Sequence, residues 1–264
     1  MLAFLELRDV GKSFRSRSGR ASIAVQRFSL AVRRGEFLCL LGPSGCGKTT
    51  VLSMVAGFEA PTSGSILLDG AQVREPSRDR GVVFQGDDSL YPWLTAAQNI
   101  AFGLRVRGVG ARERREKALS YLELVGLSGQ AEKFPSELSG GMKQRIQIAR
   151  ALANEPKMLL MDEPFGALDA QTRLIMQQEL RRIWKATGTT VVFITHDIDE
   201  AILLSTRIGV MTAGPGGTLK SVVPIDIEGE RERTDPAYIR YYAQVHGDIR
   251  EEVAKASAYG KQAA

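Results

Sequence analysis

Short apolar runs recur along the chain, and stretches with a helical pattern follow several of them. Within each run apolar side chains occupy successive positions, which is typical of strands buried on both faces in a parallel sheet covered by helices. The runs are 37–41, 81–84, 158–161, 191–195 and 208–211. This alternation of strands and helices predicts an α/β fold.

Three helices are predicted from their pattern and from the glycine that ends each one, since glycine readily adopts the left-handed conformation just past a helix. They are 48–56, 111–125 and 171–187. Between the second and third apolar runs, helical patterns dominate. We therefore expect an α/β core formed by 1–85 and 157–225, an inserted all-helical subdomain at 86–156, and a C-terminal tail or short helix at 226–264.

A phosphate-binding loop is predicted directly after the first run. The segment Gly42-Pro-Ser-Gly-Cys-Gly-Lys-Thr49 matches G-x-x-x-x-G-K-[ST] and leads into a helix. Its glycines let backbone N–H groups surround a phosphate, while Lys48 reaches the β- and γ-phosphates and the Thr49 hydroxyl binds Mg²⁺. We assign nucleotide binding here to Gly42, Pro43, Ser44, Gly45, Cys46, Gly47, Lys48, Thr49 and Thr50.

Two adjacent carboxylates end the run at 158–161. Asp162 is placed to hold Mg²⁺ through water, and Glu163 is a candidate general base for a water that attacks the γ-phosphate. Either motif alone has a plainer interpretation, a helix-capping turn or an acidic strand end. Together they predict a nucleoside triphosphatase.

A second anion-binding helix start is predicted at Leu138-Ser-Gly-Gly, where Ser139 is a good N-cap and Gly140 and Gly141 leave N–H groups open. This helix start is one of six elements that follow one another along the chain in a fixed order. In that order, residues 1–225 closely resemble the ATP-binding cassette (ABC) transporter ATPases. The elements are the phosphate loop, Gln85, Leu-Ser-Gly-Gly, Asp162-Glu163, Ala167-Leu168-Asp169 and His196. The resemblance implies a P-loop core with a mixed sheet flanked by helices, carrying an inserted helical subdomain.

The same resemblance implies roles for four further residues. Phe14 would stack on adenine, although an apolar strand-end contact is the alternative. Gln85 would contact Mg²⁺ and the attacking water, and His196 would touch the γ-phosphate; for both, a plain surface or structural residue is the alternative. Asp169 would lie at a subunit boundary. Met142 departs from the family pattern, because many members have Gln there.

Family members work as pairs that sandwich two ATP molecules, so the resemblance implies a dimer, expected to be a homodimer; a pair with a paralogue stays open. Ser139, Gly140 and Gly141 would then act on the nucleotide of the other subunit. Each such motif occurs once in this chain, as expected of a half-site contributor.

Several segments resemble the ATPases of bacterial importers for nitrate, sulfonates, taurine and related small anions. They are 80–85, 90–95, 99–103, 163–169 and 195–201. The resemblance implies integral membrane permease subunits as partners, indirectly a solute-binding protein, and a peripheral location on the cytoplasmic face of the cell membrane. Trp93 would lie against the membrane subunit, or form part of the helical core.

Composition and net charge bear on three other possibilities: a membrane-spanning helix, a signal peptide and a nucleic-acid partner. No run reaches the roughly 18 apolar residues of a membrane-spanning helix, and the first residues lack the basic start of a signal peptide, so we expect neither. The net charge of +5 is the one feature favouring a soluble cassette protein acting on nucleic acid or ribosomes. Because such relatives carry two cassettes or a long coiled coil, which this chain lacks, we expect no nucleic-acid partner.

Two local features keep two interpretations each. The basic cluster at 102–118 has six basic and two acidic residues, and either faces anionic headgroups or is a solvated helix face. Cys46, at a helix start, is either a reactive thiol with a lowered pKa or a small residue that lets the loop close.

Overall fold

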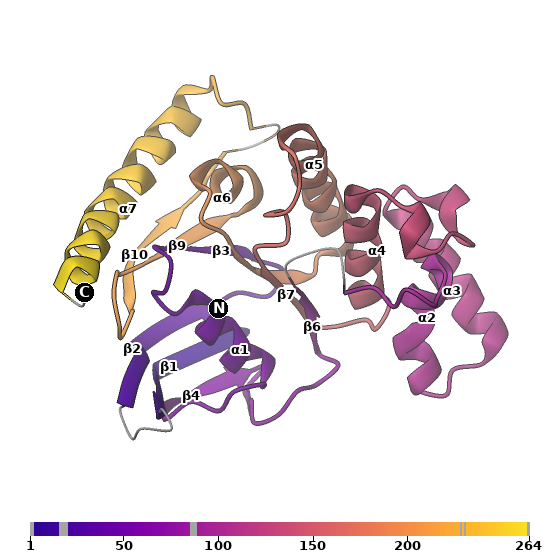
Figure 1. Cartoon of the computed structure of the whole chain (residues 1–264), viewed down its shortest axis with the longest axis horizontal. Coiled ribbons are helices and arrows are strands. Elements are labelled where there is room, and N and C mark those ends of the chain that lie inside the picture. The colour runs from indigo at the N-terminus through magenta and orange to yellow at the C-terminus, as the bar shows by residue number, and fades with distance from the viewer. Residues whose placement is uncertain (1–2, 16–20, 85–88, 228, 230, 263–264) are drawn as a thin grey trace. The chain divides into compact units, whose positions relative to one another are not determined.

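The computed structural model describes residues 3–15, 21–84, 89–227, 229 and 231–262, with side chains described as far as residue 256. The chain forms two compact units. One contains residues 1–77 and 190–264 and the other contains residues 78–189. Each unit is described by itself below, with element labels as in Figure 1.

The first unit contains an antiparallel sheet of strands β1 (Leu5–Arg15), β2 (Ala21–Val32), β4 (Ser63–Leu68) and β5 (Ala71–Gln72), in the order β2-β1-β4-β5. The apolar pattern does not predict this sheet. Its two long strands pair with several register shifts between Leu7 and Ser13, and each shift interrupts the alternation by which a half-buried strand is recognised.

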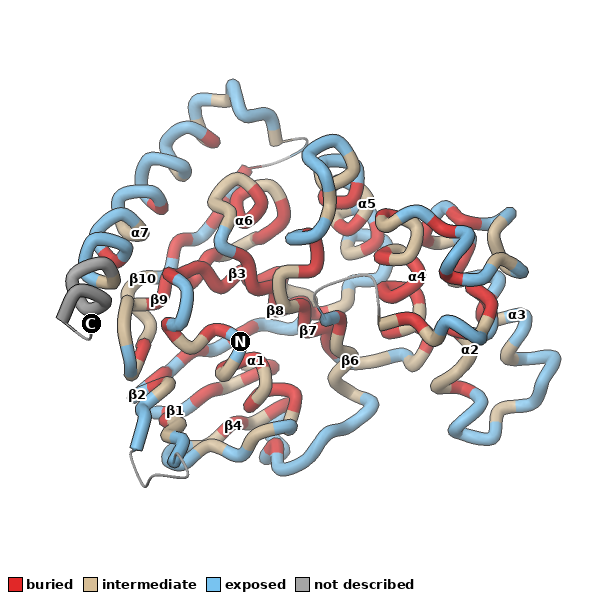
Figure 2. The backbone as a smooth tube through the Cα atoms, in the orientation of Figure 1, coloured by how far each residue is buried: buried red, intermediate tan, exposed pale blue. Residues whose placement is uncertain are grey.

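The same unit contains a second sheet, centred on β3 (Phe37–Leu41). This strand pairs in parallel with β8 (Thr190–Ile194) and β9 (Arg207–Met211), and β10 (Leu219–Pro224) pairs antiparallel with β9. Every residue of β3 and β8 is buried, as Figure 2 shows for β3. The mixed sheet confirms the predicted fold class and the predicted strands of this unit.

Among its described residues, the first unit has three helices: α1 (Lys48–Ala56), α6 (Ile198–Leu204) and α7 (Pro236–Gln262). The predicted bounds of α1 are correct. The last helix has 27 residues and is therefore much longer than the short helix or tail that we expected. Its buried side chains, among them Tyr238, Val245 and Glu252, are few and include a carboxylate, so the apolar stripe that marks a helix is faint in the sequence.

Where the structure describes it, the second unit contains the parallel pair β6 (Arg80–Val83) and β7 (Met158–Asp162) and four α-helices. The helices are α2 (Ala96–Val106), α3 (Ala111–Leu124), α4 (Gly140–Leu152) and α5 (Ala170–Thr187), with short 3₁₀ turns at Ser128–Gln130 and Pro135–Glu137. Two of these helices match predicted ones to within one residue. In the part of the chain that the structure describes, no helix is long and apolar enough to cross a membrane.

Asn99 organises the segment that precedes α2. Its side chain is fully buried; Oδ1 accepts from the Tyr91 amide at 2.8 Å, and Nδ2 donates to the carbonyls of Tyr91, Leu94 and Thr95 at 3.0–3.1 Å. The turn held in this way presents Trp93 with 69% of its surface exposed. Trp93 is therefore not part of the helical core, which was one of its two predicted placements.

We expect Asn99→Ala to lower the free energy of unfolding by about 2–3 kcal/mol, because it leaves a buried backbone amide and several carbonyls without their partner. Urea denaturation followed by circular dichroism measures the loss. Gln178→Ala, at an exposed position of α5, is the control and should cost less than about 0.5 kcal/mol. Equal effects of the two changes would contradict the organising role of Asn99.

Candidate active site

The phosphate loop begins where β3 ends and leads into the first turn of α1. Gly45 and Gly47 have φ of +77° and +99°, which favours glycine. A Cβ on Gly47 would also lie 2.6 Å from the Ala24 carbonyl oxygen. Backbone conformation thus favours glycine at both positions, and close approach also requires it at Gly47. Both residues lie just before the positive end of a helix dipole.

Lys48 lies inside this loop. Its side chain is held where the loop begins, because Nζ donates to the carbonyl oxygens of Gly42 at 2.7 Å and of Pro43 at 2.9 Å. The residue is only 7% exposed. A buried ammonium at the start of a helix suits a multiply charged anion, and the binding of phosphate by this loop stays a prediction.

Cys46 is fully buried in the loop, with Sγ 3.9 Å from Lys48 Nζ. Burial raises the pKa of its thiol above the ordinary value, although the neighbouring Lys48 acts in the opposite direction. Because a reactive cysteine needs a lowered pKa and some exposure, this finding favours the second interpretation, in which Cys46 is a small residue that lets the loop close.

His196 follows β8 at the same edge of the sheet as the phosphate loop. Strands β3 and β8 are parallel neighbours, with Leu40 opposite Ile194, and ligands of α/β sheets bind at the carboxyl ends of such strands. The Thr195 amide donates to the Leu40 carbonyl at 3.3 Å, and the Asp197 carboxylate caps α6 by accepting from the Glu200 amide at 3.1 Å. His196 is exposed between these two anchored neighbours.

Phe14 lies near the end of β1 and is 41% exposed. Lys12 Nζ is 5.0 Å from the centroid of the Phe14 ring and donates to Glu59 at 2.6 Å and to the Ala60 carbonyl at 2.8 Å. Lys12 was not among the residues predicted to form the site. The ring exposes enough surface for a base to stack on.

In the second unit, β7 ends in Asp162 and Glu163 follows with φ of +43°, the left-handed region that non-glycine residues seldom adopt. Backbone strain of this kind gathers at functional positions. The parallel strand β6 ends at Val83, opposite Met161, and Phe84 follows it with half its surface exposed. Gln85, the next residue, lies outside the described residues.

Ser139 caps α4 as predicted, with Oγ accepting from the Met142 amide at 3.4 Å. A Cβ on Gly141 would lie 2.8 Å from the Thr172 side chain, so the start of α4 packs closely on the start of α5. Asp169 caps α5, a role that we did not predict although an aspartate before a helix indicates it. Hydrogen bonds from the Thr172 and Gln171 amides, at 3.0 and 3.1 Å, lower its pKa.

Three basic residues of the cluster at 102–118 pair with carboxylates of the second unit. Arg112 pairs with Glu116 at 2.8 Å, Arg115 with Glu132 at 2.9 Å, and Lys117 with Glu155 at 2.9 Å. These exposed pairs are those of a solvated helix face, the second of the two interpretations of this cluster.

The chain resembles known proteins both in sequence and in fold. A model of the ABC transporter family matches residues 25–166. The nitrate import ATP-binding protein of Synechococcus elongatus is 47% identical over 241 residues, 89% of this chain and 87% of its own. The taurine import ATP-binding protein of Sinorhizobium fredii is 46% identical over 242 residues, 89% and 90%. A dimeric ATP-binding cassette solved in a post-hydrolysis state with ADP and phosphate bound has a TM-score of 0.72 at 33% identity, over 84% of this chain and 99% of its own.

Replacing Glu163 by Asn and by Gln tests its backbone strain, because both remove the carboxylate but Asn adopts positive φ more readily. We expect Glu163→Asn to be more stable than Glu163→Gln by up to about 1 kcal/mol, or about 2–4 °C in the melting midpoint. The same two substitutions at Glu116, inside α3, should give the reverse order of stability, since Gln favours a helix more than Asn does. Equal midpoints at position 163 would contradict the strain.

Proposed function

We propose that this chain, which belongs to the ABC transporter family and is an ATPase of that family, powers the uptake of a small anion through separate integral membrane subunits. The observation that carries the nucleotide site is the phosphate loop at the edge of a parallel sheet, in which the buried Lys48 donates to the carbonyl oxygens of Gly42 and Pro43. The names of its relatives, which concern nitrate and taurine import, support a small anion as the solute.

The triphosphate is bound by the amides of the loop 42–49 and by Lys48, and Phe14 stacks on the adenine. A second copy of the chain completes each site, with Ser139, Gly140 and Gly141 of that copy facing the γ-phosphate and Asp169 at the boundary. The dimeric state of the related cassette with ADP and phosphate supports this pairing.

Mg²⁺ fits the donor set that the sequence supplies, because the Thr49 hydroxyl, the Asp162 carboxylate and the Gln85 amide are oxygen donors and Mg²⁺ takes few protein ligands beside substrate phosphates. When bound, the ion offsets negative charge on the β- and γ-phosphates. Glu163 accepts a proton from the water as the oxygen of that water attacks the γ-phosphorus. His196 donates a hydrogen bond to the γ-phosphate. The bond from phosphorus to the bridging oxygen breaks, and ADP and phosphate leave.

The exposed Trp93 and the turn that Asn99 holds form the surface that we assign to the membrane subunit. An exposed aromatic on a rigid turn is the kind of residue that anchors protein interfaces. The chain then lies peripherally on the cytoplasmic face of the membrane, and a solute-binding protein acts on it only through the permease.

Removing the base tests the ATPase assignment. We expect Glu163→Gln to lower ATP turnover at least 100-fold, the usual contribution of a general base, while ATP binding and ATP-dependent dimerisation persist in size-exclusion chromatography. Lys48→Ala should abolish both binding and dimerisation. Glu232→Gln, an exposed change in the chain that precedes α7, is the control with unchanged turnover. Near-normal hydrolysis by Glu163→Gln would refute the assignment.

The transport assignment is tested in vesicles that contain the chain, its permease and its solute-binding protein. Nitrate, taurine or another small sulfonate should stimulate ATP hydrolysis several-fold, whereas an uncharged sugar should not. Loss of this stimulation in Trp93→Ala, with basal hydrolysis retained, supports the interface. Stimulation by the sugar alone would contradict an anion as the solute.

A further inference from the structure

The turn between β9 and β10, residues 212–218, lies directly behind the phosphate loop. A Cβ on Gly217 would lie 2.0 Å from the Cys46 carbonyl oxygen, and one on Gly42 would lie 3.1 Å from Met211 Cβ. The end of β9 and the turn at Gly217 therefore both lie against the phosphate loop, with no room for an added Cβ. Because packed interiors are hardly compressible, a movement of the turn must move the loop.

The turn is also tied to β2, which touches the phosphate loop as well. The Gly216 amide donates to the Ile23 carbonyl at 2.8 Å, and the Gln26 amide donates to the Gly217 carbonyl at 3.2 Å. Within the turn, the Thr212 amide donates to the Thr218 carbonyl at 2.9 Å. These bonds hold the turn at Thr212 and at residues 216–218, but they do not include Ala213.

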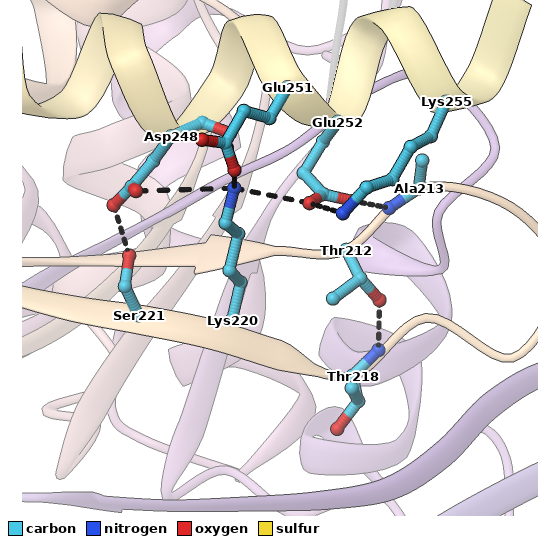
Figure 3. A network of polar contacts seen from close by, with 9 residues as sticks. All are labelled: Thr212, Ala213, Thr218, Lys220, Ser221, Asp248, Glu251, Glu252 and Lys255. Carbon is cyan, nitrogen blue, oxygen red and sulfur yellow. Dashed lines mark hydrogen bonds and ion pairs between the residues drawn. The ribbon is translucent and has the colours of Figure 1, made fainter.

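Ala213 is held by Glu252 of α7. Oε2 of Glu252 accepts from the Ala213 amide at 2.8 Å, and Oε1 lies 2.7 Å from Lys255 Nζ and 3.2 Å from Lys220 Nζ (Figure 3). The Glu252 side chain is 1% exposed, whereas that of Glu251, which pairs with Lys220 at 2.5 Å, is 66% exposed. Two adjacent glutamates thus share one lysine, but only one of them reaches the turn.

The Glu252 carboxylate stays ionised in this buried place. Burial acts to raise its pKa, but Lys255, the Ala213 amide and Lys220 together hold the pKa below its ordinary value. A hydrogen bond to an ionised acceptor is about twice as strong as one between neutral groups. The bond to Ala213 is therefore well suited to hold a loop segment in one position.

We propose that Glu252 is a positioning residue for nucleotide binding: through Ala213 it fixes the turn 212–218 behind the phosphate loop, and so sets the affinity of that loop for the triphosphate. The proposal rests on the proposed role of the loop 42–49 in holding the phosphates. Small displacements matter here, because the backbone amides of the loop bind a phosphate only within hydrogen-bond distance.

The test compares variants of Glu252 that differ in reach and in charge, using the full chain and a fluorescent ATP analogue. Glu252→Ala and Glu252→Asp withdraw the acceptor from Ala213, and both should raise the Kd about 10-fold, with kcat at saturating ATP changed less than about twofold. Glu252→Gln loses the charge but keeps the reach, and should restore the Kd to within about threefold of the unaltered chain.

Glu251→Ala is the matched control, because it removes the neighbouring exposed partner of Lys220 and should leave the Kd unchanged. If Glu252→Ala does not fold, Glu252→Asp decides, since it keeps a carboxylate beside the lysines. A Kd for Glu252→Asp within twofold of the unaltered chain overturns the proposal. The proposal is also overturned if, among the Glu252 variants, Kd varies with the melting midpoint instead of with the length of the side chain.

The proposed phosphate loop is tested separately in the same assay. If Lys48→Ala binds the analogue as tightly as the unaltered chain, the assignment of the loop is wrong, whatever the Glu252 variants do. If Lys48→Ala loses binding and Glu252→Asp does not, the loop assignment stands and only the positioning role of Glu252 is refuted.

Discussion

A loop that binds phosphate through backbone amides must be held from behind, because it has few side chains with which to hold itself. Gly45 and Gly47 free the amides but give up the contacts that side chains would make. The missing contacts are supplied by neighbours at very short range, namely Ala24 of β2 and the turn at Gly217. Both sheets of the first unit take part in this support, since β2 and the end of β9 each lie against the loop.

The structure of the phosphate loop and its flanking elements could be predicted from the sequence, because it depends on local features. The strand at 37–41, the helix after it and the family itself follow from short patterns read in order, and all are confirmed. The antiparallel sheet could not be predicted, since register shifts hide its alternation. The roles of Asn99 and Glu252 could not be predicted for another reason. Both side chains bind backbone groups, which every residue type carries, so the sequence does not mark the partner. In addition, 39 residues separate Glu252 from Ala213.

Both units present residues at the carboxyl ends of parallel strands. In the first, the ends of β3 and β8 carry the phosphate loop and His196; in the second, the end of β7 carries Asp162 and Glu163. The second unit adds a helix start at Ser139 that packs on the capped start of α5. Each unit therefore offers groups suited to an anion or to a reacting water, built by the same strand-then-loop geometry.

The close approach of Gly217 to Cys46 has an evolutionary consequence. Every replacement of Gly217 adds a Cβ where the carbonyl oxygen of Cys46 lies 2.0 Å away, so no such change is accommodated unless the loop shifts first. A shifted loop would in turn leave a gap behind it unless position 217 filled that gap. Substitutions on the two sides are thus epistatic, and descendants of this chain can alter either one only along paths that alter both.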